Sequence, residues 1–230
     1  VSGFEVRYSS GMGVALSGKY DSAEAINVHH NWQNGILILG DNGTANNNRV
    51  WSNCMSNENG TASSWPSGLS AARHPNNAVI TNNVVYGNWG EGLSTYEANG
   101  TLIEGNIIYD NWSANLYVSD ATNVVVKRNF VYATGAMTGG SQVGIMMGDE
   151  VYAPASANIQ VVNNIVYGTT RTYYWWQGVQ GGGMVNVTIA NNTFVNSRSI
   201  VGFQINDGAH QDVNIHNNII VQEGNLPIAY

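Results

Sequence analysis

One short phrase recurs along almost the whole chain and constrains its fold more than any other feature. The clearest copy is VITNNVVYGNWGEGL at residues 79–93, and the next, LIEGNIIYDNWSANL, begins at Leu102. Aligned on the second polar residue of the NN pair, the copies place one polar residue at Asn53, Asn83, Asn106, Asn129, Asn164, Asn192 and Asn218. The gaps are 30, 23, 23, 35, 28 and 26 residues, so a minimal unit of about 23 residues carries insertions. A unit this small cannot bury its own apolar face, which predicts a stacked solenoid.

The local pattern within each copy is that of a β-strand. Val and Ile dominate and alternate with other residues, which is strand periodicity rather than helix periodicity. A coil of short strands and turns, stacked on the next coil, is a β-helix. We therefore expect an all-β fold in which successive coils pair in parallel.

Composition supports a stacked architecture and excludes some partners. Charged residues make up only 10% of the chain, against roughly 25% in ordinary soluble domains, and Asn and Gly take the polar positions instead. The net charge of −7 and the lack of a basic stripe argue against nucleic acid as a partner. No apolar run approaches the ~20 residues that a membrane span requires. The single cysteine, Cys54, follows Asn53 and is expected to be a small core residue.

The repeat runs nearly from end to end, so we expect residues 1–230 to form a single β-helix domain. A solenoid needs a polar or helical cap at each end, and neither terminal segment reads as one. We therefore expect a fragment of a longer protein whose caps lie outside it.

A second strand in each coil begins with Gly or a small residue and continues Gly-apolar-x-x-x-polar. Its copies are GVALSG at 13, GILILG at 35, GLSAAR at 68, GLSTYE at 92, NLYVSD at 115, GIMMGD at 144, GVQGGG at 178 and GFQIND at 202. With a period of two, the first and third residues after the Gly should face inward. The residues between them should face outward and stack at ~4.8 Å on the next coil.

Two further columns are expected to be structural. Tyr86, Tyr109, Tyr132 and Tyr167 recur three residues after the aligned Asn and should form a stack. Glu104 and Lys127 occupy one column on adjacent coils, where a cross-strand ion pair is expected.

The repeated Asn, the aliphatic columns and the coil of about 23 residues resemble the right-handed parallel β-helix superfamily, the pectate-lyase-like group. The resemblance implies a single right-handed parallel β-helix of about eight to nine coils. It also implies the activities of that group, which contains polysaccharide lyases, glycoside hydrolases and sugar epimerases. The chain lacks the Asp-Pro-His run of alginate epimerases and the Asp-Asp, Gly-His and Arg-x-Lys set of polygalacturonases, so no single family's catalytic residues carry over.

Such enzymes hold their substrate along one outward sheet face, and two features point to the Gly-apolar strands. The strand ends form a charged column, and its candidate catalytic residues are Arg73, His74, Glu97, Asp120 and Asp149. Aromatic residues concentrate near the same strands, and the candidate sugar-binding residues are Trp89, Tyr96, Trp112, Tyr117, Trp175 and Trp176. The alternative is structural: acids at strand ends can be solvated turns, and a tryptophan column can cap the core.

Three roles remain open. The first is glycoside hydrolysis by paired carboxylates, with Glu97 and Asp120 about 5 Å apart on adjacent coils. The second is β-elimination from a uronate polysaccharide, with Ca²⁺ held by Glu97, Asp120 and Asp149 and with Arg73, His74 or Tyr96 as the base. The third is a non-catalytic, adhesin-like solenoid that binds glycans or acts as a spacer. For each role we expect a secreted or cell-surface protein with a glycan as its partner.

Overall fold

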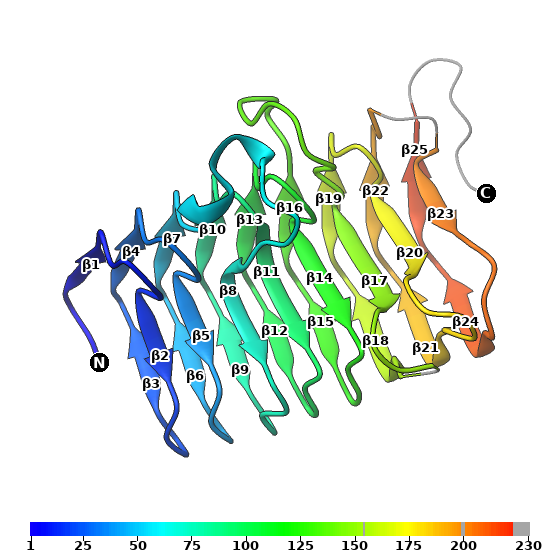
Figure 1. Cartoon of the computed structure of the whole chain (residues 1–230). Coiled ribbons are helices and arrows are strands. Elements are labelled where there is room, and N and C mark those ends of the chain that lie inside the picture. The colour runs from blue at the N-terminus through cyan, green and yellow to red at the C-terminus, as the bar shows by residue number, and fades with distance from the viewer. Residues whose placement is uncertain (154, 199–200, 223–230) are drawn as a thin grey trace.

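The structure is a computed structural model that describes residues 1–153, 155–198 and 201–222. Over these residues the chain winds through about eight turns of a solenoid, and its strands form three parallel sheets (Figure 1). One short 3₁₀ helix, η1 (Met55–Gly60), interrupts the described strands. The predicted all-β parallel β-helix is therefore confirmed. The closing segment, residues 223–230, lies outside the described residues.

Each turn contributes one strand to each sheet. The β2–β23 sheet contains β2 (Val14–Leu16), β5 (Ile36–Ile38), β8 (Ser67–Ala72), β11 (Glu91–Tyr96), β14 (Leu116–Ser119), β17 (Ile145–Asp149), β20 (Tyr173–Gln177) and β23 (Phe203–Ile205). The β3–β24 sheet contains β3 (Ser22–Glu24), β6 (Thr44–Asn46), β9 (Val79–Thr81), β12 (Leu102–Glu104), β15 (Val125–Lys127), β18 (Ala157–Val162), β21 (Val185–Ala190) and β24 (Gln211–His216). The β1–β25 sheet contains β1 (Glu5–Arg7), β4 (Asn27–His29), β7 (Arg49–Trp51), β10 (Val84–Tyr86), β13 (Ile107–Tyr109), β16 (Phe130–Tyr132), β19 (Ile165–Tyr167), β22 (Thr193–Val195) and β25 (Ile219–Val221).

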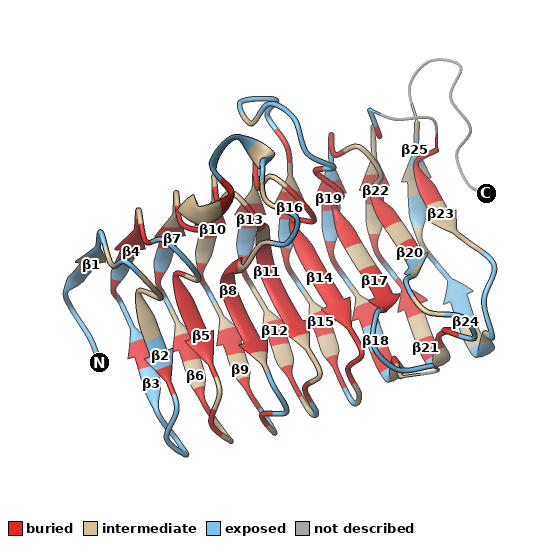
Figure 2. Ribbon diagram, in the orientation of Figure 1, coloured by how far each residue is buried: buried red, intermediate tan, exposed pale blue. Residues whose placement is uncertain are grey.

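The inward side chains of all three sheets meet in one continuous apolar core. The predicted inward positions of the Gly-apolar strands lie in it, and six of them are fully buried: Leu93, Thr95, Leu116, Val118, Ile145 and Met147. Figure 2 shows that burial extends over most of the central strands of the β2–β23 sheet. The buried residues include outward-facing ones such as Ser70 and Tyr117. The outer face of this sheet is therefore also shielded from solvent in its central part.

The NN motif combines two conformational requirements at the turn from the β3–β24 sheet to the β1–β25 sheet. The first residue takes a left-handed conformation, with φ of 57° at Asn82 and 58° at Asn163, which Asn tolerates better than most residues. The second Asn is buried and bonds to the next coil: Asn83 Nδ2 donates to Asn106 Oδ1 at 3.0 Å. The resulting ladder joins seven buried or nearly buried residues, Asn48, Asn83, Asn106, Asn129, Asn164, Asn192 and Asn218.

The assignment of Asn53 to this ladder is wrong. Asn48 occupies that position, and Asn53 belongs to a second ladder at the next turn, where its Nδ2 donates to Asn88 Oδ1 at 3.1 Å. The second ladder runs through Asn31, Asn53, Asn88 and Asn111. Cys54 consequently lies in register with Trp89 rather than with Val84. It is fully buried, as expected of a core residue.

The two predicted structural columns are present. The rings of Tyr86, Tyr109 and Tyr132 stack with centroids 4.9 and 4.6 Å apart, and Tyr167 pairs in register with Tyr132. Lys127 Nζ lies 3.3 Å from Glu104 Oε2, which forms the expected ion pair. Both columns lie away from the β2–β23 sheet.

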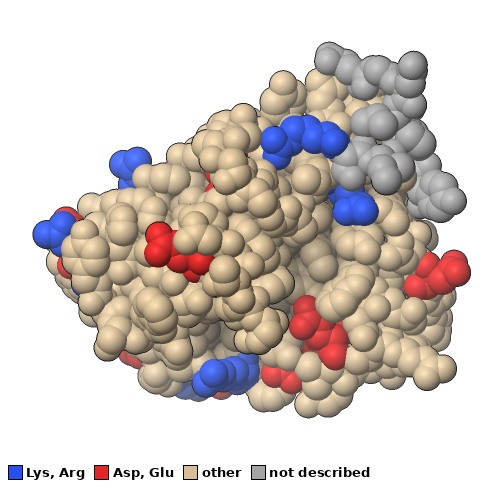
Figure 3. All heavy atoms as spheres, turned by 45° about the horizontal axis from the view of Figure 1, so that its top comes forward, with Lys and Arg blue, Asp and Glu red and all other residues tan. Residues whose placement is uncertain are grey.

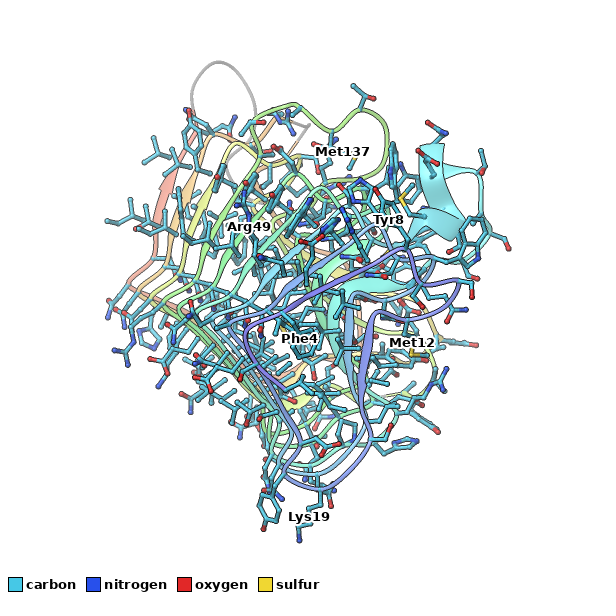
Figure 4. All side chains as sticks on the ribbon, turned by 90° about the vertical axis from the view of Figure 1, so that its left-hand side faces the viewer. Phe4, Tyr8, Met12, Lys19, Arg49 and Met137 are labelled. Atoms are coloured by element: carbon cyan, nitrogen blue, oxygen red, sulfur yellow. The ribbon has the colours of Figure 1, made fainter. Side chains whose placement is uncertain are left out.

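One predicted strand is misplaced. The strand of the seventh turn is β20, and the run GVQGGG follows it, so this run lies in the connection to β21 rather than on a strand. The second half of the preceding run TTRTYYWW, from Tyr173 onward, forms β20 itself. The longer connections instead flank the β2–β23 sheet: residues 52–66 and 133–144 on one edge, and 150–153 and 178–184 on the other. Figure 4, which looks along the solenoid, shows Met12 on the side opposite Arg49 and Met137 at the top of the view.

Candidate active site

The outer face of the β2–β23 sheet carries a groove made of two adjoining hollows. Their volumes are about 590 and 480 Å³. The in-register floor of the groove consists of Leu37, Ser70, Ser94, Tyr117, Met146 and Tyr174 on six successive strands. Both hollows share Ser64, Trp65, Glu91, Tyr117 and Glu150 at their junction. Figure 3 shows this side of the molecule, where charged residues are few and separated by uncharged surface.

Glu91 lies at the junction of the two hollows. It faces outward because Gly92, the next residue, faces inward, where a Cβ would lie 2.3 Å from Asn111 Nδ2. Glu91 Oε1 accepts a hydrogen bond from Trp65 Nε1 at 2.8 Å, and Oε2 accepts one from Ser67 Oγ at 3.2 Å.

The surroundings of Glu91 favour its protonated form. The pKa of the Glu91 carboxyl is raised to about 7, mainly by burial and to a small extent by the charge of Glu150, against the lowering effect of the hydrogen bonds from Trp65 and Ser67. At neutral pH the carboxyl therefore carries its proton in about half of the molecules. A carboxyl of this kind can donate a proton to a substrate oxygen.

A tyrosine holds a second carboxyl group that lines the same two hollows. Tyr117 Oη donates to Glu150 Oε1 at 2.6 Å; the tyrosine is buried, and Glu150 is exposed to the groove. Burial, followed by the charge of Glu150, raises the pKa of Tyr117 far above its ordinary value. The phenol therefore remains a hydrogen-bond donor and orients the Glu150 carboxyl group.

The two halves of the groove differ in chemistry. In the first hollow, Ser94 Oγ lies 2.8 Å from Ser67 Oγ and 2.7 Å from Ser70 Oγ. The second hollow has an apolar floor, where Met146 and Tyr174 pack against the cluster of Ala114, Tyr117 and Val143. At its rim, the Arg171 guanidinium lies 4.8 Å from the Tyr174 ring centroid. A ligand that spans both halves meets hydroxyls on one side and aromatic surface on the other.

The predicted acid column exists, but it does not form the centre of the groove. The register of Tyr96, Ser119 and Gly148 places the following residues, Glu97, Asp120 and Asp149, on successive coils. Glu97, Asp120 and His74 line a separate hollow of about 310 Å³ at the corner of the sheet. Their position at the strand ends turns these side chains away from the groove floor.

Backbone amides donate hydrogen bonds to the two aspartates of that column. Asp120 accepts hydrogen bonds from the amides of residues 150, 151 and 152 at 2.9, 3.0 and 2.9 Å. Asp149, fully buried, accepts from the amides of residues 155, 156 and 183 at 3.2, 2.9 and 2.9 Å. These carboxylates therefore hold the turns that border the groove. Among the described residues, no cluster of three or more His, Cys, Asp or Glu side chains is arranged to hold a metal ion. Glu97, Asp120 and Asp149, the predicted Ca²⁺ ligands, therefore do not form such a cluster.

Asp149→Ala should lower the free energy of unfolding by about 3–5 kcal/mol, because it leaves three amides, two of them buried, without an acceptor. Chemical denaturation measures this loss. Glu97→Gln, at the corresponding position two coils away, should change the stability by less than about 0.5 kcal/mol. Equal losses in the two variants would contradict a specific structural role for Asp149.

Three other predicted residues do line the groove. Arg73, Tyr96 and Tyr117 all border the first hollow. Burial, aided by the charges of Glu97 and Asp120, raises the pKa of Tyr96 to about 12, so this phenol is neutral at physiological pH. It can act there as a hydrogen-bond donor but is poorly suited to act as a base.

The predicted tryptophans divide into three groups. Trp176 lines the second hollow, with 36% of its surface exposed, whereas Trp175 is fully buried in the core and cannot contact a ligand. The prediction that Trp175 binds sugar is wrong because β20 begins at Tyr173, so that Tyr173 and Trp175 face inward. Trp89 and Trp112 share the expected column but line neither hollow.

Trp112 instead supports the wall of the groove. Its ring lies 4.7 Å, edge to face, from that of Trp65. Gly60 and Gly140, from the two long connections on this edge, approach it so closely that a Cβ at either position would clash with it. Trp65 is thereby held in place to bond Glu91.

Sequence reasoning missed Glu91, Glu150, Trp65 and the serine hydroxyls. The available signal was position: Glu91 directly precedes the Gly of a Gly-apolar strand, and Glu150 directly follows another such strand. Only the fold shows that Trp65 and Glu150 reach the same point of the groove.

These features define a class: a parallel β-helix with a groove that crosses successive coils of one sheet and has two carboxyl groups at its centre. The chain belongs to the family described as right handed beta helix region, whose model matches residues 2–174. The predicted superfamily and the right-handed winding are thereby confirmed. No curated protein sequence matches the chain.

Several solved structures share the fold. The mannuronan C-5 epimerase AlgE4 A-module of Azotobacter vinelandii is 17% identical, with a TM-score of 0.75 over 98% of this chain and 62% of that chain. A variant of the periplasmic alginate epimerase AlgG is 15% identical, with a TM-score of 0.70 over 95% of this chain and 50% of that one. Pectate lyase Pel9A is 15% identical, with a TM-score of 0.54 over 96% and 52%. The chain thus spans less than two thirds of each of these proteins.

Proposed function

We propose that this chain binds a polysaccharide along the groove of the β2–β23 sheet and cleaves it by glycoside hydrolysis. The observation that carries the proposal is a carboxyl group with a pKa of about 7, Glu91, beside a second carboxylate, Glu150, at the junction of the two hollows. Glycoside hydrolysis uses two carboxyl groups, one of which must hold a proton, and Glu91 can do so at neutral pH.

Each residue has a role in this reaction. Glu91 donates its proton to the glycosidic oxygen as the bond to the leaving sugar breaks. Glu150, oriented by Tyr117, acts on the opposite side of the sugar ring, either by activating water or as the nucleophile. Trp65 holds the Glu91 carboxyl in position, and Tyr96 and Trp176 offer aromatic surface to sugar rings in the two hollows.

One observation favours β-elimination as the second candidate. Arg73 lines the first hollow and Arg171 the second, so a guanidinium lies on each side of the junction. Guanidinium groups bind carboxylates well and could neutralise those of a uronate chain. Elimination would produce an unsaturated uronate, which absorbs ultraviolet light, whereas hydrolysis would not.

A panel of neutral and uronic polysaccharides, with and without a chelator, tests the proposal. Reducing ends without ultraviolet absorbance support hydrolysis, and the appearance of absorbance supports elimination. Binding without product would leave a glycan-binding module, and the absence of binding would contradict the proposal. The fold's polysaccharide-acting neighbours and the groove chemistry also support an extracellular, cell-surface or periplasmic location. No described helix is long and apolar enough to cross a membrane.

The rate of cleavage should fall as the pH rises through about 7, because Glu91 must hold its proton to act as an acid. Stability should change in the same direction. Between the ordinary value of 4.5 and about 7, the native state binds more protons at Glu91 than the unfolded state does, so the free energy of unfolding falls with rising pH. The Glu91→Gln variant should lack this part of the pH dependence of stability. Parallel profiles for the two proteins would contradict the assignment.

A further inference from the structure

A chain of three serine hydroxyls connects Glu91 with the floor of the first hollow. Ser67 Oγ lies 3.2 Å from Glu91 Oε2 and 2.8 Å from Ser94 Oγ, and Ser94 Oγ lies 2.7 Å from Ser70 Oγ. The three residues are only 7, 4 and 3% exposed, in that order, and all of them line the hollow. The reaction outlined above does not use this chain.

The direction of these hydrogen bonds depends on the charge of Glu91. Each hydroxyl has one proton to donate. When Glu91 is ionised, Ser67 must donate to it, Ser94 to Ser67 and Ser70 to Ser94, so Ser70 can only accept a bond from a ligand. When Glu91 is protonated, the whole chain can reverse, and Ser70 then donates outward.

We propose that this hydroxyl chain couples a sugar-binding subsite over Ser70 to the protonation of Glu91. A ring or glycosidic oxygen that accepts a hydrogen bond from Ser70 favours the reversed chain and therefore the protonated acid. Filling this subsite loads the proton that the reaction consumes. Gln33, Asn34 and Leu37, from the preceding coils, border the same hollow and supply the remaining contacts. The inference deepens the proposed function and rests on its glycan-binding part.

Other titratable groups near Glu91 must be separated from this effect. Burial raises the pKa of Tyr117 and of Cys54 well above their ordinary values, so both are neutral near pH 7. Arg73 and Tyr96 border the same hollow, and neither changes its charge in this range, since the pKa of Tyr96 is about 12. Glu150 is the remaining group, and Glu150→Gln removes it.

The first test needs no ligand. Carbon-13 NMR of glutamate-labelled protein, with the Glu91 signal identified by its loss in Glu91→Gln, follows the carboxyl through a pH titration. Ser94→Ala removes the donor that polarises Ser67, so the pKa of Glu91 should rise by about 0.5. Ser94→Thr, which keeps a hydroxyl, and Ser56→Ala, a serine of the same hollow outside the chain, should leave it unchanged. An unchanged pKa in Ser94→Ala would overturn the proposal.

The second test measures the coupling itself. Hexagalacturonate and cellohexaose are titrated calorimetrically at pH 7 into Glu150→Gln protein, in buffers of different ionisation enthalpy. We expect a net uptake of less than one proton per bound hexasaccharide, and at least a threefold smaller uptake when Ser94→Ala is added. Equal uptake in both proteins would overturn the hydroxyl coupling alone. If neither sugar bound even the wild type, glycan binding, and with it the proposed function, would be contradicted.

Discussion

Glu91→Gln should reduce the rate of polysaccharide cleavage by about 10²–10⁴-fold, because the amide cannot give a proton to the leaving oxygen. The substitution keeps the size of the side chain and an oxygen that can accept the bond from Trp65, so the groove should keep its shape. Affinity for oligosaccharides should change by no more than a few-fold. Initial rates and binding isotherms of the two proteins measure these effects separately.

The controls for this variant come from the same sheet. Glu97→Gln removes a carboxylate that lines the corner hollow rather than the groove, and it should leave the rate within about twofold of the wild type. Glu91→Gln should also be at least as stable as the wild type above pH 7, since it removes the cost of burying an ionised carboxylate. Retention of more than a tenth of the activity by Glu91→Gln would exclude Glu91 as the acid.

Asn106→Leu should lower the free energy of unfolding by about 3–5 kcal/mol. Asn106 Nδ2 donates to Asn129 Oδ1 at 3.0 Å, and its Oδ1 accepts from both the amide and the side chain of Asn83 at 2.9 and 3.0 Å. Leucine fits the apolar surroundings but leaves these buried groups without partners. Urea denaturation of the folded domain measures the loss.

Asn99→Ala is the matched control, because Asn99 belongs to an exposed row of asparagines where water can replace the lost bonds. Its effect should stay below about 1 kcal/mol. If Asn106→Leu cost no more than Asn99→Ala, the interior ladder would not be the element that holds successive coils in register.

The repeat was sufficient to predict how the coils are built, and one ambiguity in it produced an error. Strand periodicity and the left-handed residue before each ladder Asn are local properties, so they are visible in any single copy. The assignment of Asn53 failed because several coils carry a buried Asn at two turns, and residues 46–53 contain candidates for both. Counting the distance between copies could not distinguish the two ladders where an insertion changes the spacing.

The candidate groove lies on the expected sheet, but Glu97, Asp120 and Asp149 do not line it. Stacking placed Glu97, Asp120 and Asp149 on successive coils, as expected. The turn that follows β17 decided the role of the two aspartates, since its amides bind both Asp120 and Asp149. A carboxylate that accepts three backbone bonds stabilises a turn and is not available to a substrate.

The sequence by itself determined the solenoid, its inward residues and the sheet that carries the groove, because these depend on patterns repeated within about 23 residues. Only the tertiary structure decided which acid can hold a proton at neutral pH. That property depends on desolvation and on specific donors. For Glu91 the donors are Trp65 and Ser67 on the preceding turn, and the neighbouring charge is that of Glu150 two turns further on. The packing of the coils alone brings these groups together.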